Sequence, residues 1–187
     1  TPHLDAMARE GVRLDRFYAA APVCSPTRGS CLTGRHPSRY GIDWAAEGRM
    51  PAEEVTLAEA LREAGYRTGH FGKWHLGQLS RTLTQGRKNK VDAAKYSPPW
   101  DNGFDTCFST EASVPTFNPY HYTNTAAKVE SILRQDAETA GRDHRWPESY
   151  WTGPGRIVDE PLEGDDSALI MDRALEFIRG AGGKPFF

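Results

Sequence analysis

The sequence has no uninterrupted run of roughly 18 apolar residues, the length that a membrane-spanning helix needs, so no membrane span is predicted. It also lacks the excess of basic residues that is typical of nucleic-acid-binding proteins, because 23 Lys and Arg stand against 25 Asp and Glu. It contains no internal repeat. With 187 residues, 38% of them hydrophobic, the chain is long enough to bury a substantial core as one domain or as part of a larger one.

Cysteine is scarce, and its spacing excludes two common uses. The chain has Cys24, Cys31 and Cys107, with no Cys-x-x-Cys pair, so neither a zinc knuckle nor a redox pair is predicted. The tyrosine-phosphatase spacing does not fit either, because Ser30 stands six residues after Cys24, where that spacing requires Arg. The sequence leaves open whether Cys31 and Cys107 pair. A single cysteine is by default a small buried hydrophobe.

The segment 24–35, which reads CSPTRGSCLTGR, favours a reactive site instead. Pro26 suits the first turn of a helix, and Gly34 supplies a stop. Cys24 is therefore expected at a helix N-terminus, where free N–H groups and the helix dipole favour anions. Arg28 lies one turn further on the same face, so we expect a nucleophile and a cation side by side.

A second segment, 69–77, reads GHFGKWHLG. If it is extended, the period of two places Lys73 and His75 on one side and Trp74 on the other. A lysine and a histidine that face one point suit an anionic group whose charge must be held in a transition state. By the same alternation His70 faces away from His75, and we predict only a structural role for it. For His75 alone, a satisfied structural histidine would be the default interpretation.

Both segments resemble motifs of the sulfatase family. Segment 24–35 resembles the signature Cys-x-Pro-x-Arg followed by Thr-Gly, and segment 69–77 contains the family's Gly-Lys-Trp-His-Leu-Gly element. The resemblance implies that a maturation enzyme oxidises Cys24 to formylglycine, which becomes the catalytic nucleophile. It also implies that Lys73 and His75 line the sulfate pocket, with Lys73 binding sulfate and His75 assisting regeneration of the formylglycine.

The implied mechanism is covalent catalysis. A hydrated formylglycine has two hydroxyls on one carbon, so one can attack sulfur and the other can later drive collapse to the aldehyde, which expels sulfate. Arg28 and a divalent cation, usually Ca2+ in relatives, would activate the nucleophile and offset the developing charge. By the same resemblance, formylglycine at Cys24 is itself a metal ligand.

The sequence departs from the family pattern at the metal site. Sulfatases take most metal ligands from an Asp-Asp pair near the first strand and an Asp-Asn pair in the C-terminal half. Asp165-Asp166 is interpreted as a helix N-cap and first turn, and Asp101-Asn102 lies in a proline-rich loop, so neither pair is predicted to bind metal. The remaining ligands are expected outside this chain. The missing initiator Met and the apolar ending 184–187, typical of the start of a buried strand, predict a chain incomplete at both ends.

Helix and strand patterns alternate along the chain and predict an α/β sheet flanked by helices. The resemblance narrows this class to the alkaline-phosphatase-like fold. It makes residues 1–187 the N-terminal portion of one catalytic domain, with a loop-rich insertion over about 79–161. The patterns predict helices over 1–11, 56–65 and 167–179 and strands over 12–18 and 66–74.

Two stretches of the insertion, 97–105 and 150–155, are rich in aromatic and turn-forming residues and resemble loops of bacterial sulfatases that act on glycans. Their Trp and Tyr side chains fit two roles equally, stacking on sugar faces or fixing the loops to the core. The run 81–95 is interpreted as a solvated basic loop.

The resemblance therefore predicts a periplasmic or extracellular sulfuric ester hydrolase that acts on a sulfated glycan or another small sulfated compound. Its predicted partners are this substrate and the maturation enzyme. The nearest alternative is a phosphonate or phosphate ester hydrolase of the same superfamily, which can share the formylglycine motif. Charge distinguishes the two, because a phosphate dianion needs more cationic contacts than a sulfate monoanion. A noncatalytic glycan-binding remnant is the alternative from another class. The 187-residue chain alone is predicted to be inactive and to bind calcium poorly.

Overall fold

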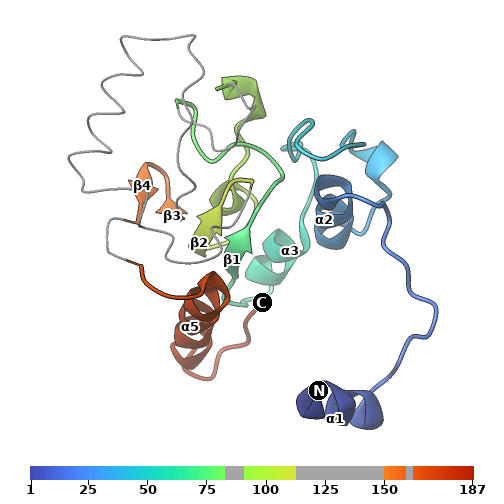
Figure 1. Ribbon diagram of the computed structural model, residues 1–187. Coiled ribbons are helices and arrows are strands. Elements are labelled where there is room, and N and C mark those ends of the chain that lie inside the picture. Colours follow the sequence, from blue (N-terminus) through green and yellow to red (C-terminus); the bar gives the residue numbers. More distant parts are fainter. Residues whose placement is uncertain (83–90, 113–149, 159–161) are drawn as a thin grey trace.

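The computed structural model describes residues 1–82, 91–112, 150–158 and 162–187 (Figure 1). Helices and strands alternate in this part of the chain, which confirms the predicted α/β class. The described helices and strands are α1 (Pro2–Glu10), α2 (Cys24–Thr33), α3 (Leu57–Glu63), β1 (Gly69–Lys73), β2 (Thr106–Thr110), β3 (Trp151–Gly153), β4 (Arg156–Ile157) and α5 (Asp166–Arg179). Within the described residues, no helix is both long and apolar enough to cross a membrane.

The strands form one mixed sheet in the order β1-β2-β3-β4. β1 and β2 run parallel, with Lys73 opposite Thr110, and β3 and β4 continue the sheet in antiparallel fashion. At the free edge of β1, Phe186 forms a parallel bridge with Arg67. The apolar ending 184–187 thus lies beside β1 as a strand would, in agreement with its sequence pattern.

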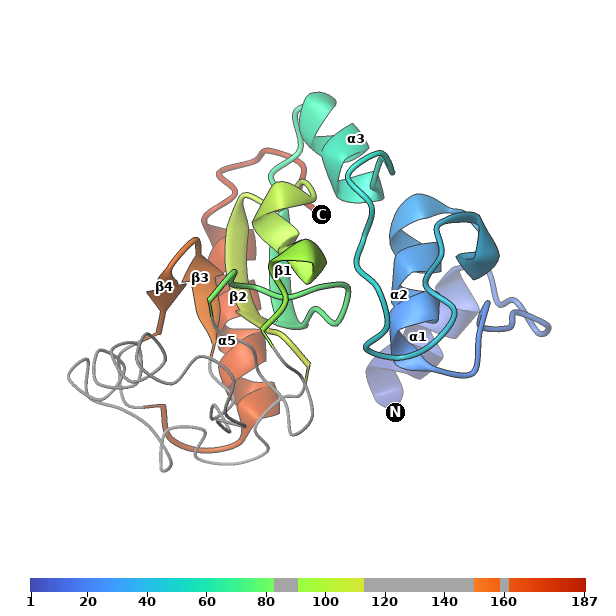
Figure 2. The same ribbon diagram turned by 90° about the horizontal axis from the view of Figure 1, so that it is seen from above.

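Helices lie on both sides of this sheet. α5 packs against β1, where the rings of Phe71 and Phe177 lie 5.5 Å apart between centroids. α2 and α3 are neighbours on the side of the molecule away from α5 (Figures 1 and 2). The main core gathers the following buried side chains: Tyr40, Ile42, Met50, Ala58, Trp74, Leu76, Leu79, Phe104, Cys107 and Trp151. Each large apolar side chain contributes on the order of 1.5–3 kcal/mol on burial. Trp74 and Leu76, which follow β1 directly, belong to this core, so it fixes the chain where β1 ends.

The helix ends follow the local sequence signals. At α3, the Thr56 hydroxyl accepts the Glu59 N–H at 3.1 Å and the Glu59 carboxylate accepts the Thr56 N–H at 2.8 Å, which is the predicted capping box. Gly34 ends α2 with a left-handed φ of 67°. Asp165 accepts the Ser167 N–H at 2.9 Å and caps α5, as its position in the sequence predicts.

The predicted strand over residues 12–18 is wrong. This segment is irregular and belongs to no strand of the sheet, and its apolar side chains are exposed, Val12 at 87% and Phe17 at 81%. The helix α1 before it forms as predicted, yet Leu4 and Met7 on its apolar face are also exposed. An extended segment becomes a strand only when a neighbour pairs with its N–H and C=O groups, and no described segment pairs with residues 12–18.

Gly103 permits the close approach of α3, which gives a first prediction. Its φ is +92°, and a Cβ there would lie 2.4 Å from the Glu59 nitrogen and 2.8 Å from the Ala58 carbonyl carbon. We expect Gly103→Ala to lower the free energy of unfolding of the full-length protein by about 3 kcal/mol, from backbone strain and overpacking together. Gly34→Ala is the matched control, because its φ is also positive but nothing lies within 4 Å, so about 1 kcal/mol is expected. If urea denaturation gave the same loss in the free energy of unfolding for Gly103→Ala and Gly34→Ala, the close contact with α3 would not be the reason why residue 103 must be glycine.

Candidate active site

Cys24 is the first residue of α2, as the sequence predicts. Pro26 lies in the first turn, where its missing N–H leaves no helical bond unmade. The Thr27 hydroxyl donates to the Ala21 carbonyl oxygen at 2.7 Å and fixes the chain where it enters the helix. The partly buried Cys24 side chain is thereby held at the N-terminal end of α2, where backbone N–H groups remain available to an anion.

Cys24 and His75 are 51 residues apart in the chain but in contact, since Cys24 Sγ lies 3.1 Å from His75 Nδ1. The sequence predicted that both residues belong to one site, but the predicted extended conformation of 73–75 is wrong. β1 ends at Lys73, and His75 has a left-handed φ of 58°. The ring of His75 is therefore aimed at Cys24 by a turn after the strand and not by the alternation of a strand.

Backbone pairing with the end of β2 holds this turn. The Trp74 N–H donates to the Thr110 carbonyl oxygen at 2.9 Å, and the His75 N–H donates to the Glu111 carbonyl oxygen at 2.8 Å. The site thus lies at the carboxyl ends of the parallel strands β1 and β2, the edge at which α/β proteins bind their ligands.

Arg28 supplies the cation that its spacing predicted. Its Nη1 donates to the Lys73 carbonyl oxygen at 2.6 Å, which ties α2 to the end of β1. Its Nε is buried and has no partner among the described residues. Burial lowers the pKa of Arg28 from its ordinary value, and the neighbouring Cys24 opposes this shift. Because an arginine stays protonated in proteins, a fixed positive charge lies beside Cys24.

His75 is neutral in this environment. Loss of hydration, together with the positive charges of Lys73 and Arg28, lowers the pKa of His75 to about 4. At pH 7 the ring is therefore unprotonated, so one ring nitrogen has a free lone pair, and the two neighbouring cations favour an anion near the ring. The structure therefore brings together all four residues that the sequence singled out: Cys24, Arg28, Lys73 and His75.

His70 has the structural surroundings that its position predicts. Its ring packs edge-on against Trp74 and Phe104, with centroids 5.2 and 5.3 Å away, and its Nδ1 lies 2.7 Å from Ser109 Oγ. Burial, together with the nearby charge of Arg28, lowers the pKa of His70 to about 3, although the Lys73 backbone opposes this shift. The ring is thus a neutral member of the packed core.

The depressed pKa of His70 makes stability depend on pH. Its folded value of about 3 lies below the ordinary value of 6.5, so between these pH values only the unfolded chain binds the proton. The free energy of unfolding should therefore fall as the pH falls below 6.5, with His70 accounting for about 2 kcal/mol between pH 7 and pH 5. His70→Phe should remove this share in urea denaturation of the full-length protein, whereas the exposed His36→Phe should not. The same pH dependence in wild type and His70→Phe would contradict the assignment.

The described residues do not fit a metal site. Within residues 1–82, 91–112, 150–158 and 162–187, no three His, Cys, Asp or Glu side chains lie close enough together to hold an ion. The charged neighbours of His75 are Lys73 and Arg28, which repel a cation. Asn102 is buried, and its Nδ2 donates to the Pro98 carbonyl oxygen at 2.7 Å and to Ser97 Oγ at 3.1 Å, so its side chain is held within the proline-rich loop. We therefore assign no chemical step to a metal.

The other cysteines do not pair. Cys31 is exposed and free, and Cys107 is buried and free. Burial raises the pKa of Cys107 to about 12, so this thiol is an inert part of the core. The question that their spacing left open is thereby answered.

The aromatic residues after residue 149 belong to the core. Tyr150 and Trp151 are 0% and 2% exposed, and the Tyr150 ring stacks on Phe108 at 4.0 Å between centroids. Of the two roles that their sequence allowed, the structure therefore supports packing for these two residues. Most of the predicted insertion over 79–161, and the middle of the predicted basic loop over 81–95, lie outside the described residues.

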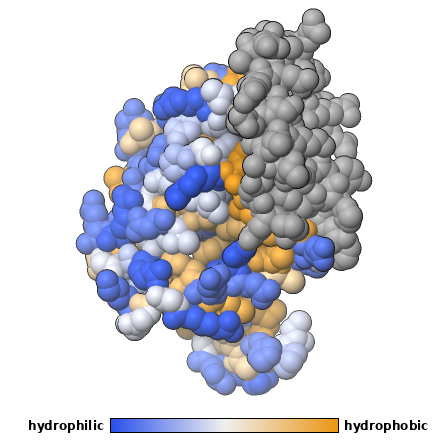
Figure 3. All heavy atoms as spheres, turned by 90° about the vertical axis from the view of Figure 1, so that its left-hand side faces the viewer, coloured by the Kyte–Doolittle hydropathy of each residue, from blue (hydrophilic) through white to orange (hydrophobic). Residues whose placement is uncertain are grey.

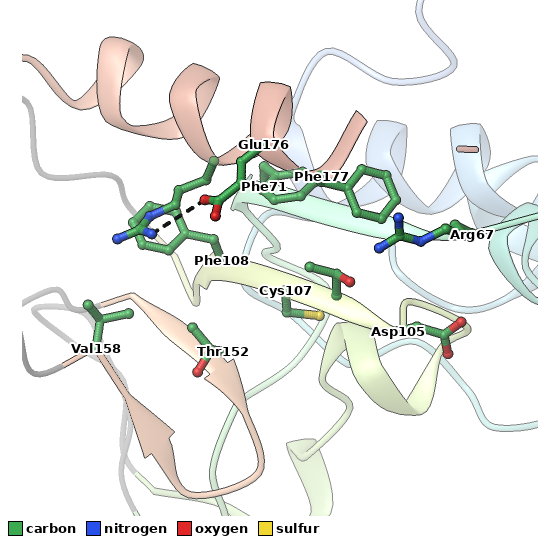
Figure 4. Close-up of a pocket in the computed structure, with 11 residues that line it drawn as sticks. Arg67, Phe71, Asp105, Cys107, Phe108, Thr152, Val158, Glu176 and Phe177 are labelled. Carbon is green, nitrogen blue, oxygen red and sulfur yellow. Dashed lines mark ion pairs between the residues drawn. The ribbon is translucent and has the colours of Figure 1, made fainter. Parts of the chain in front are cut away.

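A separate pocket of about 710 Å³ lies between α5 and the sheet (Figure 4). Phe71, Phe108 and Phe177 line it, together with an ion pair in which Arg173 and Glu176 lie 3.7 Å apart. Apolar residues gather in a band on this side of the molecule (Figure 3). The pocket is not lined by Cys24, Arg28, Lys73 or His75. We place the candidate site at the cluster of these four residues.

Glu111, whose carbonyl oxygen accepts the His75 N–H, was not predicted from the sequence. The signal available was a carboxylate directly after residues 106–110, a segment that the sequence analysis did not predict as a strand and that forms β2. That signal is weak, because nothing local to Glu111 shows that its strand lies beside β1.

Comparison with known proteins gives one consistent result. The family model described as Sulfatase matches residues 1–187. Arylsulfatase G of Rattus norvegicus is 51% identical over 212 aligned residues that cover 100% of this chain and 34% of the relative. N-acetylgalactosamine-6-sulfatase of Canis lupus familiaris is 32% identical over 202 aligned residues that cover 100% of this chain and 33% of the relative. The crystal structure of Ps i-CgsB in complex with k-i-k-neocarrahexaose superposes with a TM-score of 0.71 at 22% identity, covering 100% of this chain and 38% of that one. The chain thus has the fold of that structure and spans about a third of these relatives' length.

Proposed function

Because this chain belongs to the sulfatase family, we propose that the protein hydrolyses a sulfate ester through a formylglycine made from Cys24. The observation that carries this proposal is the contact of 3.1 Å between Cys24 Sγ and His75 Nδ1 beside the guanidinium of Arg28. In this contact the cysteine sulfur stands in for a hydroxyl oxygen of the hydrated aldehyde. A nucleophile, a neutral base and fixed cations are the groups that acyl-type and sulfuryl-type transfers require.

Each residue then has one task. A hydroxyl of residue 24 attacks sulfur and gives up its proton, the bond from sulfur to the ester oxygen breaks, and the alcohol leaves with one proton. His75 then takes the proton of the second hydroxyl, the carbonyl of the aldehyde reforms, and the bond from carbon to the sulfate oxygen breaks to release sulfate. Addition of one water to the aldehyde restores the hydrate for the next turnover. Lys73 binds the sulfate oxygens. Arg28 offsets the negative charge that develops at residue 24.

Family membership also implies a divalent cation; we expect Ca2+, held by formylglycine 24 together with ligands from outside the described residues, because those residues form no metal site by themselves. Bound there, it would stabilise negative charge on oxygen. Residues 1–187 form part of one catalytic domain in this proposal. A formylglycine-generating maturation enzyme is the partner that the chemistry of Cys24 requires, and a periplasmic or extracellular location is the one that we propose.

A sulfated sugar is the substrate class that we propose from two of the matched proteins. One relative is named for a sulfated N-acetylgalactosamine, and the superposed crystal structure holds a neocarrahexaose. The cluster around His75 carries two positive charges, from Arg28 and Lys73, which suits the single negative charge of a sulfate ester.

Turnover by the full-length protein, made in its native host, tests the proposal. We expect release of inorganic sulfate from sulfated N-acetylgalactosamine or from an aryl sulfate, and slower release of phosphate from the matched phosphate ester. Faster release of phosphate would favour the phosphate or phosphonate ester hydrolase. No turnover of either ester by protein that carries the modified residue would favour a noncatalytic glycan-binding protein.

A further inference from the structure

Glu111 is a buried carboxylate directly behind the candidate site. It follows Thr110, the last residue of β2, and is only 4% exposed. A buried carboxylate is costly unless hydrogen bonds satisfy it, so its contacts show what it holds. Its Oε2 accepts the Leu79 N–H at 3.0 Å.

Glu111 also contacts the other end of the same segment. Its backbone carbonyl oxygen accepts the His75 N–H at 2.8 Å, so one residue holds segment 75–79 at both ends. Leu76 and Leu79, each 1% exposed, anchor the segment in the core.

The conformation of His75 needs such support. Its φ of 58° is one that non-glycine residues adopt rarely, and such a conformation persists only where the surrounding structure determines it. The same conformation aims Nδ1 at Cys24 Sγ, 3.1 Å away. If segment 75–79 loosened, the turn would relax and the ring would leave this position.

We propose that Glu111 is a positioning residue for His75: its buried carboxylate fixes segment 75–79 and thereby holds the imidazole against residue 24. This inference rests on the proposed function, in which His75 serves the formylglycine at that position. Catalytic groups must be held within a fraction of an ångström of their working geometry, and a displacement of about 1 Å can cost about 100-fold in rate.

The test compares Glu111→Ala and Glu111→Gln in the full-length protein. Glu111→Ala should lower kcat for the sulfate ester about 100-fold with KM within about threefold, because the turn loosens while Lys73 still binds sulfate. Glu111→Gln should recover most of kcat, because its amide oxygen can still accept the Leu79 N–H. Glu59 is the matched control, since its carboxylate accepts the Thr56 N–H at 2.8 Å in the same manner but in α3. Glu59→Ala should leave kcat unchanged.

Hydrogen exchange supplies a second readout that does not need turnover. Amide exchange in segment 75–79 should speed up in Glu111→Ala, return toward wild type in Glu111→Gln and stay unchanged in Glu59→Ala. If the three variants show this exchange pattern but the wild type has no turnover, the proposed function fails and the positioning role stands. If Glu111→Ala exchanges as wild type does and keeps its kcat, the positioning role is overturned. Equal loss of kcat in Glu111→Ala and Glu59→Ala would also overturn it, since the effect would then be general destabilisation.

Discussion

Cys24→Ala should abolish turnover of sulfate esters by the full-length protein while the protein still folds. No other side chain in the cluster can carry two hydroxyls on one carbon, so without residue 24 the covalent route has no nucleophile. The fold should tolerate the change, because Cys24 is only partly buried. Among the described residues, its side chain forms one hydrogen bond, which is the contact with His75. We expect a loss in the free energy of unfolding of no more than about 1 kcal/mol.

Cys31→Ala is the matched control, since this exposed cysteine lies in the same helix and should leave turnover unchanged. Cys24→Ser adds a finer readout. A serine hydroxyl can attack sulfur, but it has no second hydroxyl to expel sulfate, so a sulfated protein should accumulate after one turnover. Normal turnover by Cys24→Ala, with sulfate released in many cycles, would show that residue 24 is not the nucleophile.

Arg28→Ala should lower both turnover and stability. Its guanidinium carries the positive charge beside residue 24 and joins α2 to the Lys73 carbonyl oxygen at 2.6 Å. Loss of one such preorganised charge typically costs about 100- to 1,000-fold in kcat. Loss of the hydrogen bond, which leaves a carbonyl oxygen without this donor, should lower the free energy of unfolding by about 1–3 kcal/mol.

The chain offers a matched arginine for comparison. Arg35 lies just after the same helix and pairs with Glu54, whose side chain is only 10% exposed. Arg35→Ala leaves this carboxylate without its partner, so we expect the free energy of unfolding to fall by about 1–3 kcal/mol. It should not change kcat, because Arg35 is not one of the residues of the candidate site. Arg28→Lys should retain part of kcat, since it keeps a charge but loses the fixed planar donor. A kcat for Arg28→Ala within a few-fold of wild type would contradict the role of Arg28 in charge stabilisation.

The parts of the fold that the sequence predicts are those with a local cause. Pro26 and Gly34 bound α2, Thr56 caps α3 and Asp165 caps α5, each through groups within a few residues in the chain. The proximity of Cys24, Arg28, Lys73 and His75 was also predictable, because the motifs of the sulfatase family name these residues one by one; their roles in catalysis stay a prediction.

The parts that could not be predicted depend on contacts between distant segments. The left-handed turn at His75 is held by Glu111, which follows a different strand, so the local pattern around Lys73 suggested an extended chain instead. Residues 12–18 have the apolar pattern of a strand, but a strand forms only beside a partner segment, and the local pattern does not show whether such a partner exists. The packing role of Trp151 likewise depended on a core built from segments far apart in the chain.

The mass of the tryptic peptide 17–28, taken from the full-length protein made in its native host, tests the central claim most directly. We predict that Cys24 in this peptide has lost hydrogen sulfide and gained one oxygen, whereas Cys31 in peptide 29–35 is unchanged. An unmodified thiol at Cys24 in protein that turns over sulfate esters would contradict the formylglycine mechanism.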